Sequence, residues 1–201
     1  MGNTLAGGKL AGGNPENGRV ENDFYATNPK AVKMLFESFK EIDLTHTESI
    51  LEPCVGKGHI CNALFGLGAY SVDTIDLVDR GFSYATIADY LTYETEKKYD
   101  LVITNPPFSL AQDFIEKSFK HIKPNGYIIM FLKIQFLEGA KRKDFYEKYP
   151  PKYIYVFRNR MATWNNGNEL DPNGKRWATT MCHAWFIWQE GFTGEPVVRW
   201  L

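Results

Sequence analysis

The residues best suited to chemistry are Asn105-Pro106-Pro107-Phe108, which follow an apolar run at residues 101–103. The run is too short for a helix and is typical of a buried strand, which the prolines end because proline cannot donate into a sheet ladder. Open α/β sheets place ligands at the carboxyl ends of such strands. There, the Asn105 side-chain oxygen and the Pro106 carbonyl could each accept one N–H of an amino group, and Phe108 could stack on the planar group that carries it. The tetrapeptide indicates methylation of a poorly nucleophilic NH2 group, with an ordinary Pro-Pro turn as the alternative.

A glycine-rich turn at residues 53–58 separates a predicted strand from a predicted helix. Gly56 and Gly58 let the backbone pass close to a ligand, and Glu52 stands just before the turn. The turn does not match the dinucleotide fingerprint GxGxxG, because no third glycine follows at the required spacing. A carboxylate at this place suits a cationic cofactor better than it suits a pyrophosphate.

A further acid lies on a predicted strand at residues 71–78. Asp76 lies twenty residues past Gly56, the interval at which an acid meets ribose hydroxyls in nucleotide-binding folds. Asp79 competes with it because the ends of predicted strands shift by a residue or more, and we favour Asp76.

Local signals predict two helix starts. Asn28 followed by Pro29 is a favourable N-cap and first-turn pair, and apolar residues recur behind it at helical spacing. Ser109, with Gln112 three residues on, is a capping-box signature, so a second helix is expected to begin at Ser109.

The composition is that of an ordinary soluble globular protein, and 201 residues suffice for one domain with a sizeable core. The net charge is only −1, but residues 41–100 carry eleven acids against four bases, and residues 141–180 carry nine bases against four acids. A basic C-terminal half allows a nucleic-acid face, with a solvated lysine-rich surface as the alternative.

Other classes are disfavoured by what the chain lacks. Its three cysteines form no CxxC pair and its four histidines show no metal-ligand spacing, so no metal is expected. Neither a membrane span nor a signal pattern is visible, which favours the cytoplasm. Residues 1–20 are rich in glycine and asparagine and are expected to form a flexible tail.

An unusually long connection, residues 158–182, joins two predicted strands at residues 153–157 and 183–188 that we expect to be antiparallel neighbours. Connections of this length are usually functional or disordered. Basic residues interleaved with tryptophan suit phosphate contact and base stacking, with a mobile surface loop as the alternative. The candidate substrate-binding residues are Arg158, Arg160, Trp164, Lys175 and Arg176.

Three motifs occur in one order and at compatible spacings: FYATNP at residues 24–29, ILEPCVGKG at residues 50–58 and NPPF at residues 105–108. They resemble motifs X, I and IV of class I S-adenosylmethionine-dependent methyltransferases, and their arrangement is similar to that of DNA adenine-N6 methyltransferases with motif X first. Between the last two, IADYL at residues 87–91 resembles motif III, whose acid, here Asp89, would accept from the adenine amine of the cofactor, with a simple turn or cap residue as the alternative. The resemblance implies a Rossmann-like α/β fold over residues 21–201. Its sheet would have seven mostly parallel strands, a reversed last strand and helices on both faces.

The same resemblance implies roles for individual residues. The catalytic residues would be Asn105, Pro106, Pro107 and Phe108. Residues binding S-adenosylmethionine would be Tyr25, Thr27, Glu52, Cys54, Gly56, Gly58, Asp76, Asp89, Tyr90 and Asn105.

The activity expected from this resemblance is methyl transfer to adenine N6 in DNA, with the base flipped out of the duplex. The residues at positions 54–58 depart from a strict FxGxG, and no separate target-recognition domain follows, so the chain looks like a compact enzyme of phage or prophage type. Methylation of an RNA base or of a protein glutamine amide is the alternative. A non-catalytic module with a decayed cofactor site is disfavoured because the cofactor-facing acids are intact.

Overall fold

The structure is a computed structural model that describes residues 24–201. The tail predicted at residues 1–20 lies outside the described residues. Among the described residues, no helix is both long enough and apolar enough to span a bilayer.

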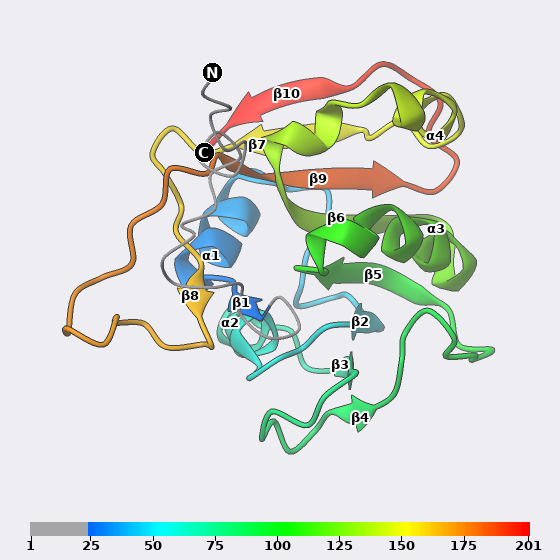
Figure 1. Cartoon of the computed structure of the whole chain (residues 1–201). Coiled ribbons are helices and arrows are strands. Elements are labelled where there is room, and N and C mark those ends of the chain that lie inside the picture. The colour runs from blue at the N-terminus through cyan, green and yellow to red at the C-terminus, as the bar shows by residue number, and fades with distance from the viewer. Residues whose placement is uncertain (1–23) are drawn as a thin grey trace, which may run out of the picture.

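One eight-stranded sheet organises the molecule, and Figure 1 shows it from β10 at the top to β4 at the bottom. The strands, in order across the sheet, are β10 (Val197–Trp200), β7 (Tyr153–Val156), β9 (His183–Gln189), β6 (Ile122–Lys133), β5 (Tyr99–Thr104), β2 (Ile50–Glu52), β3 (Val72–Asp76) and β4 (Thr86–Ile87). Strand β9 runs antiparallel to both of its neighbours, β6 and β7, and the other pairings in this sheet are parallel.

The sheet has one strand more than the seven predicted. The predicted reversed strand is β9, but β10 follows it and lies parallel to β7 at the edge of the sheet. All four β10 residues are exposed, so the strand lacks the buried face that gives a period-2 pattern. Backbone hydrogen bonds hold it instead, including those from Val197 N to Lys152 O and from Leu201 N to Val156 O.

Helices cover both faces of the sheet. Helices α1 (Pro29–Ser38) and α2 (His59–Gly66) share one buried cluster with sheet residues such as Leu101 and Ile103. Helices α3 (Ala111–His121) and α4 (Lys143–Lys148) contribute to a second cluster, which takes the alternate residue Val102 from the same strand. This alternation along β5 is expected for a strand buried on both faces.

The predicted start of α1 is confirmed. The Asn28 side chain accepts a hydrogen bond from Lys30 N at 2.9 Å, and Pro29 occupies the first turn. Behind this cap, Val32, Leu35 and Phe36 lie on the buried face of the helix.

The predicted capping box at Ser109 is wrong. A 3-10 turn, Phe108–Leu110, follows Pro107, and α3 begins only at Ala111 with no side-chain cap. The Gln112 amide does not reach back to Ser109 but donates to Glu116 Oε1 at 2.9 Å. The turn is closed by Leu110 N donating to Pro107 O, so the rigid prolines delay the helix.

Candidate active site

A cleft opens at the carboxyl ends of three adjacent parallel strands. Glu52 ends β2, Asp76 ends β3, and Asn105 directly follows β5, and all three residues line the cleft. Strand β2 lies between β3 and β5 in the sheet. From β2 the chain adds β3 and β4 on one side and then crosses to β5 on the other side, so the strand order reverses at β2. Open α/β folds usually bind ligands at such a reversal.

Glu52 has an unusual environment for a carboxyl group. Its side chain is 1% exposed, and among the described residues its Oε2 atom has no hydrogen-bond partner. Burial, together with the nearby Asp76 carboxylate, raises the pKa of Glu52 well above its ordinary value. Thr27 Oγ1, also in a residue that lines the cleft, is a second buried oxygen without a partner in the described chain. Unpaired buried polar atoms are costly, and the unpaired carboxyl oxygen of Glu52 makes the cleft suited to a ligand that donates hydrogen bonds and carries positive charge.

Asp76 is held by the glycine-rich turn. Its Oδ2 atom accepts from Gly56 N at 2.7 Å, and its Oδ1 atom accepts from Val78 N at 2.9 Å. Gly56 has φ +56°, which favours glycine, and a Cβ atom there would lie 2.5 Å from Phe24 Cε2, so any side chain would have to displace the Phe24 ring. Asp79 instead accepts from Gly81 N in a local turn and does not line the cleft.

Gly58 has a structural position outside the cleft. It is the N-cap of α2 with φ +82°, and a side chain there would collide with the Phe82 ring. Its glycine requirement is therefore explained by the turn itself. Of the other residues expected to bind a cofactor, all line the cleft, namely Tyr25, Thr27, Glu52, Cys54, Gly56, Asp76, Asp89, Tyr90 and Asn105.

Asn105 is oriented by a contact between segments 80 residues apart. Its amide nitrogen donates to the Tyr25 backbone carbonyl at 2.6 Å. Because a carbonyl only accepts, the amide nitrogen must face Tyr25, and the Oδ1 atom is turned away from it as a fixed acceptor. Pro107 lines the cleft beside Asn105, whereas Pro106 and Phe108 do not.

Phe108 packs beside the cleft. Its ring is stacked on His183 with 6.1 Å between centroids, and Lys133 Nζ lies 4.6 Å from the Phe108 centroid. His183 is buried, and its Nδ1 atom lies 3.0 Å from Met161 O, which places the ring proton on Nδ1. Burial lowers the pKa of His183 to about 4, so its ring is neutral at physiological pH.

His183 and Lys133 were not foreseen from the sequence. Lys133 of β6 and His183 of β9 are paired in the antiparallel register. Each belongs to a strand whose sequence is mainly apolar and typical of a buried core strand. A histidine at the start of such a strand was the available signal, but it had no metal-ligand partner in the sequence to single it out.

The long connection at residues 158–182 reaches the wall of the cleft. Within it, β8 (Trp164–Asn165) pairs antiparallel with β1 (Tyr25–Ala26), and Figure 1 shows the two short strands beside α2. Lys57 Nζ donates to Asn166 O at 2.8 Å, and the Trp164 ring meets the His59 ring edge-on at 5.4 Å. The connection is therefore attached to the glycine-rich turn and to the start of α2. Of the side chains that make these contacts, Trp164 was singled out from the sequence, whereas Lys57 and His59 were not.

Phe24 and Arg80 are two further cleft residues that sequence reasoning missed. The Arg80 guanidinium lies 4.2 Å from the Phe24 ring centroid, and its Nε atom is 3.8 Å from Asp76 Oδ1. Phe24 was visible as the first residue of FYATNP, whereas Arg80 belongs to no motif.

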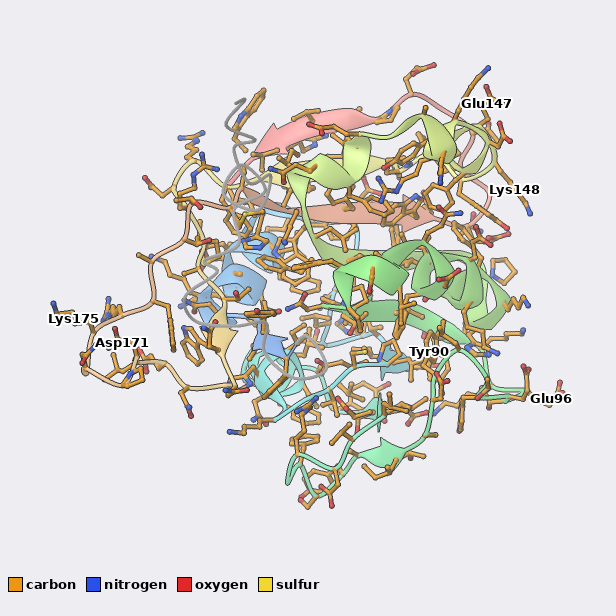
Figure 2. The ribbon with its side chains drawn as sticks, in the orientation of Figure 1. Tyr90, Glu96, Glu147, Lys148, Asp171 and Lys175 are labelled. Atoms are coloured by element: carbon orange, nitrogen blue, oxygen red, sulfur yellow. The ribbon has the colours of Figure 1, made fainter. Side chains whose placement is uncertain are left out.

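The five predicted substrate-binding residues do not form one group. Arg160, Trp164 and Arg176 line a second hollow, whereas Arg158 and Lys175 do not. Figure 2 shows Lys175 at the outer tip of the connection, near Asp171 and far from Tyr90.

Comparison with known proteins places this geometry in a fold. No protein-family model matches the chain, and no curated protein sequence matches it. Among solved structures, the methyltransferase subunit of a type I restriction-modification system from Streptococcus thermophilus matches with TM-score 0.64 and 14% identity, over 87% of this chain and 47% of that one. A candidate RNA methyltransferase from Pyrococcus horikoshii matches with TM-score 0.60 and 14% identity, over 81% and 85%.

A candidate class I S-adenosylmethionine-dependent methyltransferase from Listeria monocytogenes also matches, with TM-score 0.56 and 15% identity, over 84% of this chain and 61% of that one. This chain thus spans less than two thirds of the Listeria and Streptococcus proteins. The likenesses confirm the predicted fold class, an α/β fold of the class I methyltransferase type with a mostly parallel sheet.

Proposed function

We propose that this protein transfers a methyl group from S-adenosylmethionine to the exocyclic N6 amine of adenine in DNA, with the base flipped into the site at Asn105. The observation that carries the proposal is the Asn105 acceptor, held by Tyr25 at the edge of a cleft whose buried Glu52 oxygen has no partner in the described chain. The fold supports methyl transfer, and the type I restriction-modification match supports DNA as the substrate.

The residues of the cleft fit this cofactor. When bound, S-adenosylmethionine supplies an electrophilic methyl group on a sulfonium centre. Glu52 Oε2 would accept from its ammonium group, which provides both the missing hydrogen bond and an opposite charge. The Asp76 oxygens each keep a second lone pair for ribose hydroxyls, since each accepts only one backbone N–H. Asp89, whose Oδ1 accepts from Leu91 N, would accept from the adenine amine of the cofactor.

Asn105 would act on the target nitrogen. Its Oδ1 atom and the Pro106 carbonyl would each accept one N–H, which turns the nitrogen lone pair out of conjugation and toward the methyl group. These acceptors matter most when the nitrogen becomes tetrahedral and gains positive charge, so their effect belongs to the transition state. Phe108, held by His183 and Lys133, would bound the pocket for the planar base.

Nucleic acid is favoured over a protein amide by the second hollow. It brings Arg160 and Arg176 together with Trp164, the residue types that contact phosphates and stack on bases. RNA is the second candidate, since one structure with this fold is described as a candidate RNA methyltransferase and spans nearly the same length.

The test is transfer of radiolabelled methyl from S-adenosylmethionine to DNA, RNA and protein in parallel, followed by nucleoside and amino-acid analysis. The proposal predicts label in N6-methyl-2′-deoxyadenosine from the DNA sample, and this label should depend on Asn105. Label in RNA or in glutamine would move the substrate to the alternative, and no transfer to any of the three would refute methyl transfer by this cleft.

A further inference from the structure

A second hollow, which we name the loop pocket, lies between the first turn of α1 and the connection at residues 158–182. Its walls include Lys30, Arg160, Trp164, Glu169, Arg176 and Trp177, and it shares no lining residue with the cleft. Its volume is about 400 Å³, which falls within the range of small-molecule sites. The methyl-transfer chemistry proposed above makes no use of it.

One wall separates the loop pocket from the cleft. This wall is the two-stranded ribbon of β1 and β8, in which Ala26 pairs with Trp164. Tyr25 and Ala26 line the cleft, and Trp164 lines the loop pocket. The cleft and the loop pocket are therefore lined by paired strands of one ribbon.

The two tryptophans of the loop pocket are half-buried and anchored. The Trp164 ring contacts the His59 ring edge-on, and the Trp177 indole N–H donates to Asn168 O at 2.6 Å. Anchored aromatic rings can stack on a planar ligand with little further loss of side-chain freedom. The pocket therefore presents prepared surfaces for a flat ring.

The charge of the loop pocket is positive. Lys30, Arg160 and Arg176 contribute three cations against the single carboxylate of Glu169. Within the described part of the chain, none of these three cations has a carboxylate oxygen within 4.0 Å, because the ion pairs found there all involve other residues. Arginine beside a stacking surface suits a ligand that combines a planar ring with a phosphate.

We propose that the loop pocket binds an unpaired nucleotide of the substrate strand next to the methylated base, with its base against Trp177 and its phosphate on Arg176. This inference rests on the proposed function in taking a nucleic-acid strand as the ligand. It adds a preference: both faces of a base inside a duplex are covered by its neighbours, so the loop pocket favours single-stranded or locally opened strands over intact duplex.

The test measures binding of a fluorescein-labelled single strand of about 12 nucleotides, within the usual range for single-strand sites, by fluorescence anisotropy without cofactor. Trp177→Ala should weaken binding by about 5- to 150-fold, the usual effect of losing one stacked base. The matched control is Trp200→Ala, which removes an exposed tryptophan of β10 at the edge of the sheet and should leave the affinity within twofold. Trp177→Phe keeps a stacking ring and should retain most of the affinity.

A second pair of variants tests the phosphate contact. Arg176→Gln should lower the slope of log affinity against log salt by about 0.7, as expected for one phosphate contact on a single strand. Lys175→Gln, at the outer tip of the connection, should leave the slope unchanged.

Three results would overturn the proposal: equal affinity for Trp177→Ala and Trp200→Ala, tighter binding of the matched duplex than of the single strand, or displacement of the strand by inorganic pyrophosphate alone at equal phosphate concentration. Because no methyl transfer is measured, such a failure would leave the chemistry at Asn105 intact. Conversely, binding through Trp177 without methylation of any nucleic acid would refute the proposed function and leave the loop pocket standing.

Discussion

Glu52→Gln isolates the charge of one buried carboxyl group at the end of β2. The substitution keeps the shape of the side chain, whose Oε2 atom has no partner among the described residues and whose surface is 1% exposed. A hydrogen bond to a charged group contributes about 1.5–3 kcal/mol, which corresponds to about 10- to 150-fold in affinity. We therefore expect Glu52→Gln to weaken S-adenosylmethionine binding by that factor. The thermal unfolding temperature of the free protein should change little on this substitution. The raised pKa of Glu52 already favours its neutral form, which glutamine resembles.

The same group predicts a proton linkage of known sign. Burial raises the pKa of Glu52 in the free protein, and a bound cation favours the ionised carboxylate, so binding to the protonated form releases a proton. The affinity for S-adenosylmethionine should rise with pH by up to tenfold per pH unit. This holds over the pH range in which Glu52 is protonated in the free protein and ionised in the complex. Titration calorimetry below about pH 7, where the cofactor amine stays charged, in two buffers of different ionisation enthalpy should show this release.

Asp79→Asn is the control for these measurements, because Asp79 lies outside the cleft and serves a local turn with Gly81. Glu52→Gln should abolish the proton release, and Asp79→Asn should preserve it. If folded Glu52→Gln protein bound S-adenosylmethionine with wild-type affinity and the same proton release, the assignment of the unpaired oxygen to the cofactor ammonium would be wrong.

Asn105→Ala should keep cofactor affinity within a few fold, yet lower the single-turnover methyl-transfer rate by about 100-fold or more, as for loss of one preorganised group; a wild-type rate would refute the role of Asn105. Asp76→Ala should weaken cofactor binding by about 1.5–3 kcal/mol in calorimetry, the range for a hydrogen bond to a charged group, whereas Asp79→Ala should not. His183 has a folded-state pKa of about 4, so only the unfolded chain gains this proton as pH falls from about 6.5. The free energy of unfolding, measured by denaturant titration, should therefore fall by up to about 3 kcal/mol between pH 6.5 and 4. If the His183→Phe variant lost as much stability over this range, the loss would come from groups other than His183.

Local sequence patterns sufficed for the elements that carry the site. The apolar run before Asn105 predicts a buried strand, and strands are also predicted before the glycine-rich turn and over residues 71–78. The structure has β5, β2 and β3 at these places, with β3 ending at Asp76. Because parallel strands end at the same edge of a sheet, three separate local predictions together imply one cleft. The Asn28-Pro29 cap was equally predictable, since its hydrogen bond to Lys30 N spans two residues.

Local patterns failed where backbone or packing decided the outcome. Strand β10 has exposed residues throughout, and its pairing with β7 depends on backbone groups that leave no trace in the side-chain pattern. The 3-10 turn after Pro107 overrode a capping signature at Ser109, because the rigid prolines set the path of the chain before the helix could start.

The sequence by itself determined which chemical groups the site contains, because residue type and strand position follow from neighbours along the chain. Only the tertiary structure decided how these groups are oriented and which of them line the cleft or the loop pocket. Asn105 takes its direction from Tyr25, 80 residues away, and Phe108 is held by His183 on β9. The same long-range folding places Arg176 in the wall of the loop pocket and leaves Lys175 at the outer tip of the connection, although the two residues are adjacent in the chain.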